Sequence, residues 1–291
     1  IWDSMCATLL STAARRGAMM ATLRCDHPDI ELFIDAKREP RALRNFNLSV
    51  LVTDAFMQAV RDDRPWALVF PEAGLSPVDR HPGRARVRRH GLASESEQPC
   101  VVFKQLSARA LWQRIMRSAY QTAEPGVLFI DRINRDNNLG WREHISATNP
   151  CGEIPLPPNG ACNLGSLNLV RFVRRPFTRK ARMDLDGLGA AAADAVRLLD
   201  NVIDLSRFPL PAQAEQARGT RRLGLGITGL ADALILLGLD YRTAAARAVA
   251  TEAMARICHA AYRASVALAA ERGAFPWFDS EAYLARPFIR A

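Results

Sequence analysis

The chain has 291 residues and a mass of 32.2 kDa, which is enough for one large domain or two small ones with a buried core. Apolar residues make up 49% and charged residues 24%, which excludes a disordered chain and a low-complexity fibre. The net charge is +9, and 36 of the 39 basic residues are arginine. This balance favours anionic partners such as phosphates, although a biased base composition of the gene is the simpler explanation.

The sequence contains no apolar run near the roughly 18 to 20 residues of a membrane span, and its start lacks the features of a signal peptide. We therefore expect a cytoplasmic protein without membrane contact. The six cysteines are spread thinly and form no CxxC pair, so neither a disulfide framework nor a metal site is predicted. The sequence begins within a helical pattern and stops without a helix-ending signal, which indicates a piece of a longer protein.

The first sixty residues alternate between helical and extended patterns. Residues 1–14 form an amphipathic helical pattern, Met19–Leu23 is apolar, and a helical pattern over Ile30–Lys37 follows an Asp-His-Pro turn. Asn45–Val52 alternates with a period of two and predicts a strand. Thr53 then predicts the N-cap of the next helix.

The middle of the chain is rich in turns. Residues 64–99 shift to Pro, Gly and Arg, which predicts an exposed hairpin or surface loop insertion. Ala108–Tyr120 is helical, Gly126–Ile130 is a short apolar strand, and 131–168 has almost no helical period. We expect an α/β fold with a helix-rich C-terminal third, whose helices cover Leu185–Leu205, Gly226–Leu237 and Thr243–Arg272.

The segment 146–169 reads SATNPCGEIPLPPNGACNLGSLNL and carries the candidate chemistry. Its four prolines exclude a helix and favour an extended path. In an extended chain Asn149, Cys151 and Glu153 share one face, with neighbours about 6 to 7 Å apart. Glu153 can accept a hydroxyl proton, Asn149 can hold a hydroxyl group, and Cys151 can act as a nucleophile or as a hydrogen-atom carrier.

The carboxylate beside the thiol helps to choose between these reactions. A neighbouring carboxylate raises the pKa of a thiol and disfavours a thiolate nucleophile, whereas one-electron chemistry at sulfur needs no thiolate. The simpler alternative is that Cys151 packs in a turn and Glu153 is a solvated charge. For an isolated NxCxE motif this alternative is the more frequent one, because short motifs match by chance.

The complete string, however, resembles the finger-loop region of ribonucleotide reductase large chains, most of all the adenosylcobalamin-dependent class II type. The resemblance covers essentially the whole chain. It implies that residues 1–291 are part of a ten-stranded α/β barrel, with a finger loop at about 146–169 through its centre. Four further segments match in the same order: RRGAMMATLRCDHPDIELFIDAK, NFNLSVLVTDAFMQAV, EPGVLFIDRINRDNNL and RRLGLGITGLADALILLGLDY.

The resemblance also implies roles for individual residues. Cys151 matches the thiyl-radical cysteine that abstracts the 3′ hydrogen atom of the ribose. Glu153 matches the base for the 3′-hydroxyl proton, and Asn149 matches the amide that binds the substrate hydroxyls. Cys162 matches one of the two cysteines that become a disulfide as the 2′ carbon is reduced. The family places the partner of that cysteine upstream of the matching segments and the phosphate-binding segment downstream of them.

The implied reaction is the reduction of ribonucleotides to 2′-deoxyribonucleotides with adenosylcobalamin as the cofactor. Arg15, Arg16 and Gly17 match the flexible loop between the substrate and the effector site, and guanidinium groups beside a glycine suit phosphate or base contacts. The implied partners are the ribonucleotide substrate, nucleotide effectors and a thioredoxin-type reductant. A second copy in a homodimer, or a complementing chain fragment, is a further expected partner.

Two alternatives stay open. The first alternative is a class I large chain, which takes its radical from a separate metal-bearing subunit. The second is a truncated paralogue that binds nucleotides or a partner without turnover. The short spacing between Cys151 and Cys162 favours the cobalamin type.

Three weaker motifs have simpler interpretations. The GxGxxG string at 224–229 has no predicted strand before it, so we expect helix packing and no dinucleotide site. The clusters RHPGRARVRRH and RFVRRPFTRKAR predict solvated loops and not a nucleic-acid site. Phe172 and Phe177 in the second cluster are expected to be packing residues.

Overall fold

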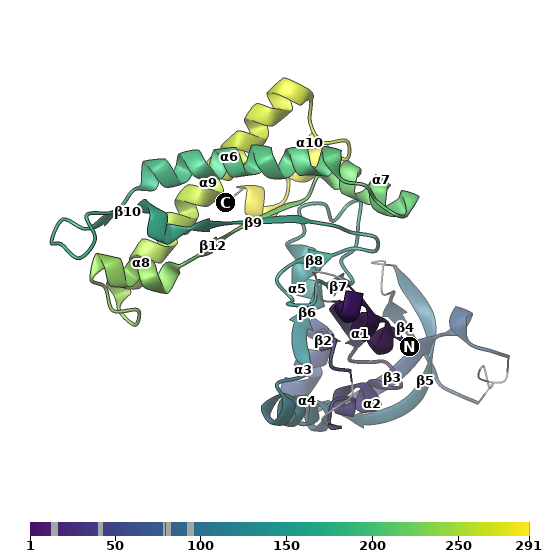
Figure 1. The fold of residues 1–291 in the computed structure, drawn as a ribbon. Coiled ribbons are helices and arrows are strands. Elements are labelled where there is room, and N and C mark those ends of the chain that lie inside the picture. The colour runs from purple at the N-terminus through teal and green to yellow at the C-terminus, as the bar shows by residue number, and fades with distance from the viewer. Residues whose placement is uncertain (13–16, 40–42, 78, 80–82, 92–95, 291) are drawn as a thin grey trace. The chain divides into compact units, whose positions relative to one another are not determined.

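The structure is a computed structural model that describes residues 1–12, 17–39, 43–77, 79, 83–91 and 96–290. The chain forms two compact units, which are drawn in Figure 1. Unit 1 contains residues 1–158 and 280–291, and unit 2 contains residues 159–279. The boundary between Pro158 and Asn159 therefore divides the segment predicted as the finger loop.

Unit 1 is a mixed α/β body (Figure 1). Its described elements, in chain order, are α1 (Trp2–Thr12), β1 (Met19–Arg24), α2 (Ile30–Asp35), β2 (Phe46–Val52), α3 (Asp54–Arg61), β3 (Pro65–Pro71), the 3-10 turn η1 (Glu72–Gly74), β4 (Arg86–His90), β5 (Glu97–Ser107), α4 (Ala108–Thr122), β6 (Gly126–Phe129), α5 (Ile130–Arg135), β7 (Ala147–Thr148), β8 (Pro155–Leu156), α10 (Ser280–Leu284) and α11 (Pro287–Arg290).

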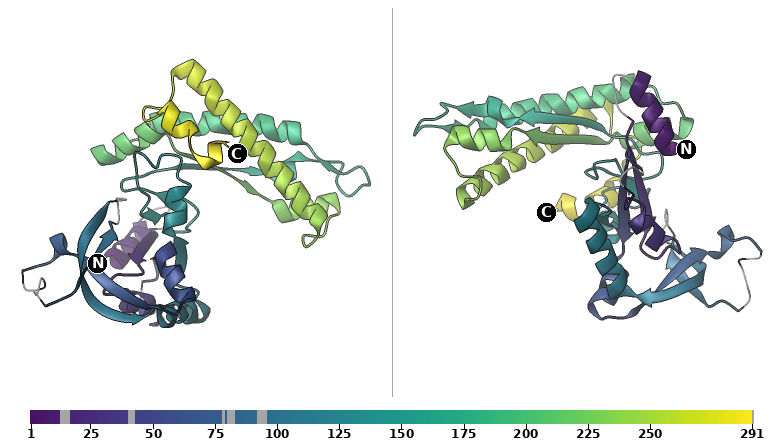
Figure 2. Two further views of the ribbon diagram at one scale, coloured as in Figure 1. Left: turned by 180° about the vertical axis from the view of Figure 1, so that it is seen from behind. Right: turned by 60° about the horizontal axis from the view of Figure 1, so that its bottom comes forward.

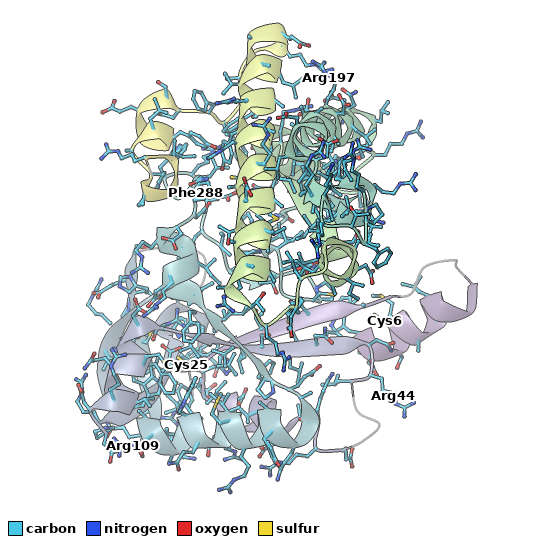
Figure 3. All side chains as sticks on the ribbon, turned by 90° about the vertical axis from the view of Figure 1, so that its left-hand side faces the viewer. Cys6, Cys25, Arg44, Arg109, Arg197 and Phe288 are labelled. Atoms are coloured by element: carbon cyan, nitrogen blue, oxygen red, sulfur yellow. The ribbon has the colours of Figure 1, made fainter. Side chains whose placement is uncertain are left out.

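A parallel sheet in the order β1-β2-β6 forms the centre of unit 1. The predicted strand over Asn45–Val52 is confirmed as β2, whose last five residues are all buried, as expected for a strand covered on both faces. The predicted cap is confirmed too, since the Thr53 hydroxyl accepts the Phe56 N–H at 3.1 Å. Cys25, labelled in Figure 3, lies in the core with Phe56 and Trp66.

The structure corrects the expectation of a surface insertion at 64–99. Strand β3 lies inside this range, and its Trp66 and Leu68 side chains are buried in the core of unit 1. It pairs with β5 in an antiparallel sheet of order β3-β5-β4, in which β4 alternates exposed and half-buried residues. The apolar run PWALVFP was hidden by the flanking Pro, Gly and Arg residues.

The range 131–168 also holds one element that the pattern did not predict. Helix α5 is a helix of six residues that buries Ile130 and Asn134. The Asn134 side chain donates to the Ile145 carbonyl at 2.9 Å and accepts the Ile145 N–H at 2.7 Å. This tertiary pairing holds the helix next to the segment that leads into β7.

Unit 2 consists mainly of helices, with two pairs of strands among its described residues. Its described elements are β9 (Asn163–Asn168), the 3-10 turn η2 (Leu169–Phe172), β10 (Val173–Arg174), β11 (Arg182–Met183), α6 (Leu185–Leu205), α7 (Pro211–Thr220), β12 (Leu223–Thr228), α8 (Leu230–Leu237) and α9 (Ala244–Arg272). The predicted helices over Leu185–Leu205 and Thr243–Arg272 are confirmed as α6 and α9.

The core of unit 2 lies where α6, α9 and the β9–β12 pair run side by side (Figures 1 and 2). Strands β9 and β12 are parallel, and Leu188 of α6 and Ile257 of α9 are buried in the same cluster. The prediction of a helix from Gly226 was wrong, because β12 runs to Thr228 and α8 begins at Leu230. Gly229, at φ +68°, makes the turn between the two elements.

The α/β class is confirmed, but the described strands fall into five small sheets and close no barrel. The ten-stranded barrel therefore stays a prediction. Among the helices of the described residues, none is long and apolar enough to cross a membrane.

Candidate functional site

Cys151 lies at the tip of a short hairpin in unit 1. Strands β7 and β8 pair antiparallel, with Ala147 opposite Leu156 and Thr148 opposite Pro155. The Gly152 N–H donates to the Asn149 carbonyl at 3.0 Å, which closes a turn of four residues. Pro150 occupies the second position of this turn, where a fixed φ is favoured, and Gly152 has φ +86°.

The expected extended path through this segment was therefore wrong. The reason is the Asn149 side chain, whose Oδ1 accepts the Ile154 N–H at 2.9 Å while the Asn149 N–H donates to the Ile154 carbonyl at 3.2 Å. These two bonds join Asn149 to Ile154 across the base of the turn and close the hairpin tip. Asn149, Cys151 and Glu153 are still brought together, but as the tip of a hairpin and not as one face of a strand.

The oxygen and the nitrogen of the Asn149 amide therefore have different roles. Its oxygen belongs to the turn, whereas its Nδ2 has no hydrogen-bond partner among the described residues. An amide nitrogen offers two donors, so this group can still hold a hydroxyl oxygen. The half-buried position of Asn149 fixes where these donors point.

Cys151 and Glu153 are both exposed. No atom lies within 4 Å of the position that a Cβ on Gly152 would occupy, so the tip is open on that side. An exposed sulfur next to an exposed carboxylate can be reached by a ligand without rearrangement of the core. The tip therefore presents a thiol, a carboxylate and an amide donor within five residues.

Two side chains that the sequence did not single out hold this hairpin. Asn47, at the start of β2, donates from Nδ2 to the Pro150 carbonyl at 2.5 Å. Thr22 of β1 donates to the Ser146 carbonyl at 3.4 Å. An exposed polar residue on an otherwise buried strand was the available signal for Asn47, since the rest of β2 is apolar or buried.

Cys162 belongs to unit 2 and directly precedes β9. It is half-buried, and its Sγ donates to the Asn163 carbonyl at 3.6 Å. Burial raises the pKa of the Cys162 thiol, and the nearby Arg222 guanidinium opposes this shift by favouring the thiolate.

The position of Arg222 follows from the strand register. β9 and β12 are parallel with Asn163 opposite Leu223, so the residues that precede them, Cys162 and Arg222, lie at the same end of the pair. The Asn163 N–H donates to the Arg222 carbonyl at 3.4 Å. No local pattern could have joined these two residues, because they are far apart in the sequence.

The predicted effector and substrate loop is described only at Gly17, since Arg15 and Arg16 lie outside the described residues. A Cβ on Gly17 would meet the Cys6 Cα of α1 at 3.0 Å. Glycine is therefore required here by the close approach of two backbones. Figure 3 labels Cys6 on α1.

The described part of the chain contains no group of three or more His, Cys, Asp or Glu residues that could hold a metal ion. In the described part of the chain, neither Cys151 nor Cys162 contacts a histidine, so the thiol–histidine pair of a cysteine hydrolase is not seen there.

The chain matches one protein-family model over residues 1–288, described as the barrel domain of ribonucleotide reductase. It is 42% identical over 284 residues to a vitamin B12-dependent ribonucleoside-diphosphate reductase of Mycobacterium tuberculosis, which covers 97% of this chain and 37% of the relative. A relative of the same name from Thermoplasma acidophilum is 38% identical over 283 residues, or 97% of this chain and 33% of the relative. The alpha subunit of a Chlamydia pneumoniae ribonucleoside-diphosphate reductase is 30% identical over 272 residues, covering 90% of this chain and 25% of the relative.

This chain therefore spans about a third of the length of the curated relatives that it matches most strongly. The match to the family model extends over both units and includes the hairpin that carries Cys151. The chain belongs to the ribonucleotide reductase barrel-domain family.

Proposed function

We propose that this chain supplies the radical-carrying part of an enzyme that reduces ribonucleotides to 2′-deoxyribonucleotides. The single observation that carries the proposal is the exposed Cys151 at a hairpin tip, flanked by the free Asn149 Nδ2 and the exposed Glu153. A thiyl radical at Cys151 would use this combination, because it needs a substrate hydrogen atom close to sulfur and a base for the adjacent hydroxyl.

The Cys151 sulfur takes the hydrogen atom from C3′, while Glu153 takes the proton of the 3′ hydroxyl and Asn149 holds the substrate hydroxyls through Nδ2. The 2′ hydroxyl leaves as water after it is protonated. Cys162 and a second thiol supply two electrons and two protons and become a disulfide, and Cys151 returns its hydrogen atom to C3′.

Adenosylcobalamin, when bound, supplies the carbon radical that starts this sequence. The residues present fit that role in one respect, because the Cys151 sulfur is exposed and no atom covers the neighbouring Gly152. Cys151 is the residue that we assign to face the cofactor. The relatives that are 42% and 38% identical are named as vitamin B12-dependent, which supports this cofactor over a separate metal-bearing subunit.

The finer expectations from the sequence belong to the same proposal. They are a ten-stranded barrel with a finger loop at about 146–169, a thioredoxin-type reductant for the disulfide at Cys162, nucleotide effectors acting through Arg15 to Gly17, and a homodimer or complementing fragment. A cytoplasmic location fits these partners. The support for these expectations is the resemblance to the family to which the chain belongs.

A chimera tests the proposal. The aligned 284 residues of the Mycobacterium tuberculosis relative are exchanged for this chain, and formation of deoxynucleotide from a ribonucleoside diphosphate is measured with a dithiol, with and without adenosylcobalamin. We expect turnover that requires the cofactor, and little or none from the 291-residue chain alone. A folded chimera that binds substrate without turnover would favour the truncated paralogue. Turnover with a metal-bearing subunit and no cobalamin would favour the class I alternative.

A further inference from the structure

The hairpin β10–β11 and the start of α6 enclose a pocket in unit 2 that the proposed reaction does not use. The pocket has a volume of about 510 Å³, within the range of small-ligand sites. Its lining is dominated by charged side chains. The segment that follows β10 projects at one end of unit 2 (Figure 1). The lining residues are Arg174, Arg175, Arg182, Met183, Asp184, Leu185 and Asp186.

The two acidic residues of the pocket are already neutralised. Asp184 accepts two hydrogen bonds from Arg174, at 2.9 and 2.5 Å, and caps α6 by accepting the Gly187 N–H at 3.0 Å. Those contacts, that of Gly187 first, lower the pKa of Asp184, so the carboxylate stays ionised. Asp186 accepts from Arg256 at 2.6 Å. The partial positive charge at the N-terminus of α6 is thus already compensated by Asp184 and Asp186.

The remaining two arginines of the pocket form no hydrogen-bonded ion pair. Arg175 and Arg182 are exposed, and no salt bridge joins either of them to another described residue, although the charge of Arg182 also acts on the Asp184 carboxylate and helps to lower its pKa. Arg182 lies directly opposite Arg174 in the antiparallel register of β10 and β11. Like charges at opposite positions destabilise a strand pair; Asp184 offsets part of that repulsion, and a bound anion would offset more of it. The three arginines of the pocket therefore share one nearby carboxylate, which only Arg174 holds by hydrogen bonds.

The loop of this hairpin extends the same positive surface. Arg179 and Lys180 are exposed, and neither side chain has an ion-pair partner in the described part of the chain. Phe177, expected from the sequence to be a packing residue, is 75% exposed. The basic cluster is thus more than a solvated loop, since its arginines line a pocket of defined volume.

We propose that the β10–β11 pocket binds the diphosphate or triphosphate group of a small ligand through Arg175 and Arg182. Guanidinium groups suit this chemistry, because their planar donors match phosphate oxygens in pairs and stay charged at every working pH. The proposal concerns unit 2 alone and does not depend on the reaction proposed for Cys151. Nucleic acid is a different class of ligand, and the test below compares an oligonucleotide with pyrophosphate to distinguish the two.

The test is a titration of the full 291-residue chain with inorganic pyrophosphate, followed by calorimetry and by thermal melting. We expect saturable binding of one pyrophosphate and a rise in the melting temperature of the free chain. The double variant Arg175→Ala/Arg182→Ala should bind about tenfold more weakly or worse. The matched control is Arg207→Ala/Arg263→Ala, which removes the same charge from exposed arginines elsewhere in unit 2 and should bind as the unchanged chain does.

The milder variant Arg182→Gln separates binding from folding. Without ligand it should melt close to the unchanged chain, because the repulsion with Arg174 that it removes is offset by the attraction to Asp184 that it loses, yet it should lose most of the stabilisation by pyrophosphate. ADP and AMP distinguish a nucleotide from a free diphosphate: equal binding of ADP and pyrophosphate assigns the site to the diphosphate group. Equal weakening in both double variants, no saturable binding, or tighter binding of a single-stranded oligonucleotide than of pyrophosphate would overturn the proposal.

Discussion

The two cysteines assigned to the reaction occupy opposite environments. Cys151 is exposed at the tip of the β7–β8 hairpin in unit 1 and is positioned by backbone contacts on both sides. Cys162 is half-buried at the start of β9 in unit 2, where burial raises its pKa and Arg222 opposes that effect. The difference fits the two roles proposed for these thiols. An exposed thiol can exchange a hydrogen atom with a ligand, whereas at Cys162 the guanidinium limits the loss of the thiolate that burial causes and that disulfide chemistry needs.

The largest effect is expected from removal of the Cys151 sulfur. Cys151→Ser in the chimera should reduce turnover at least roughly 10⁴-fold, since loss of a residue that carries the reacting atom abolishes the pathway. Because the side chain is exposed, the free energy of unfolding should change by less than about 0.5 kcal/mol. Cys258→Ser, at a half-buried cysteine of α9 without an assigned role, is the control and should keep its turnover. Comparable losses in both variants would contradict the assignment.

Asn149 offers a way to separate the geometry of the tip from its chemistry. Asn149→Asp keeps an oxygen that accepts the Ile154 N–H but removes the Nδ2 donors, so turnover should fall roughly 10²-fold while the melting temperature is kept. Asn149→Ala loses both functions and should also cost about 1 kcal/mol of stability. Equal activity of Asn149→Asp and the unchanged chimera would show that the amide nitrogen does not bind substrate.

The reactivity of the thiols provides a third comparison. At pH 8 we expect iodoacetamide to label the exposed Cys151 fastest, Cys162 more slowly and Cys25 hardly at all. Burial raises the pKa of the Cys162 thiol, and it raises the pKa of the fully buried Cys25 thiol to about 12. At pH 8 both thiols therefore carry less thiolate than an unperturbed cysteine does. The labelling profile of Cys162 should shift to higher pH than that of a free cysteine. Mass spectrometry of tryptic peptides measures each rate.

Arg222 sharpens this comparison within unit 2. The guanidinium lowers the pKa of Cys162, so Arg222→Gln should raise that pKa and slow labelling of Cys162 a few-fold at pH 8. Arg218→Gln removes an exposed arginine of α7 and serves as the control. Labelling of Cys151 should be unchanged in both variants. A faster reaction at Cys162 in Arg222→Gln would mean that Arg222 acts by covering the thiol and not by its charge.

The smallest effect concerns the support of the tip. Asn47→Ala removes the hydrogen bond to the Pro150 carbonyl, and a neutral bond of this kind is worth about 1 kcal/mol. We expect faster hydrogen exchange of the Gly152 and Ile154 amides with little change in the rest of unit 1. Asn201→Ala in unit 2 should leave this exchange unchanged. Unchanged exchange in Asn47→Ala would assign the order of the tip to the Asn149 turn alone.

Local signals predicted much of the fold. The cap at Thr53 and the alternation in β2 act within a few residues, so the sequence was sufficient there. β3 was missed because its apolar run lies in a Pro- and Arg-rich segment, and α5 because its Asn134 pairs with a residue outside the helix.

The candidate site divides in the same way. The residue types at Asn149, Cys151 and Glu153 were visible in the sequence, but the hairpin was not, since it depends on the hydrogen bond that the Ile154 backbone N–H donates to the Asn149 side chain. The neighbourhood of Cys162 depends on the register of two distant strands, which no local pattern encodes.

Isotope exchange at the ribose tests the role of Cys151 most directly. The chimera is incubated with adenosylcobalamin and a ribonucleoside diphosphate that carries tritium at C3′, and release of tritium from C3′ is measured in the Cys151→Ser and Cys162→Ser variants. If Cys151 is the hydrogen-atom carrier, release is lost in Cys151→Ser and persists in Cys162→Ser, although the latter cannot sustain reduction. Release that persists in Cys151→Ser would contradict the account.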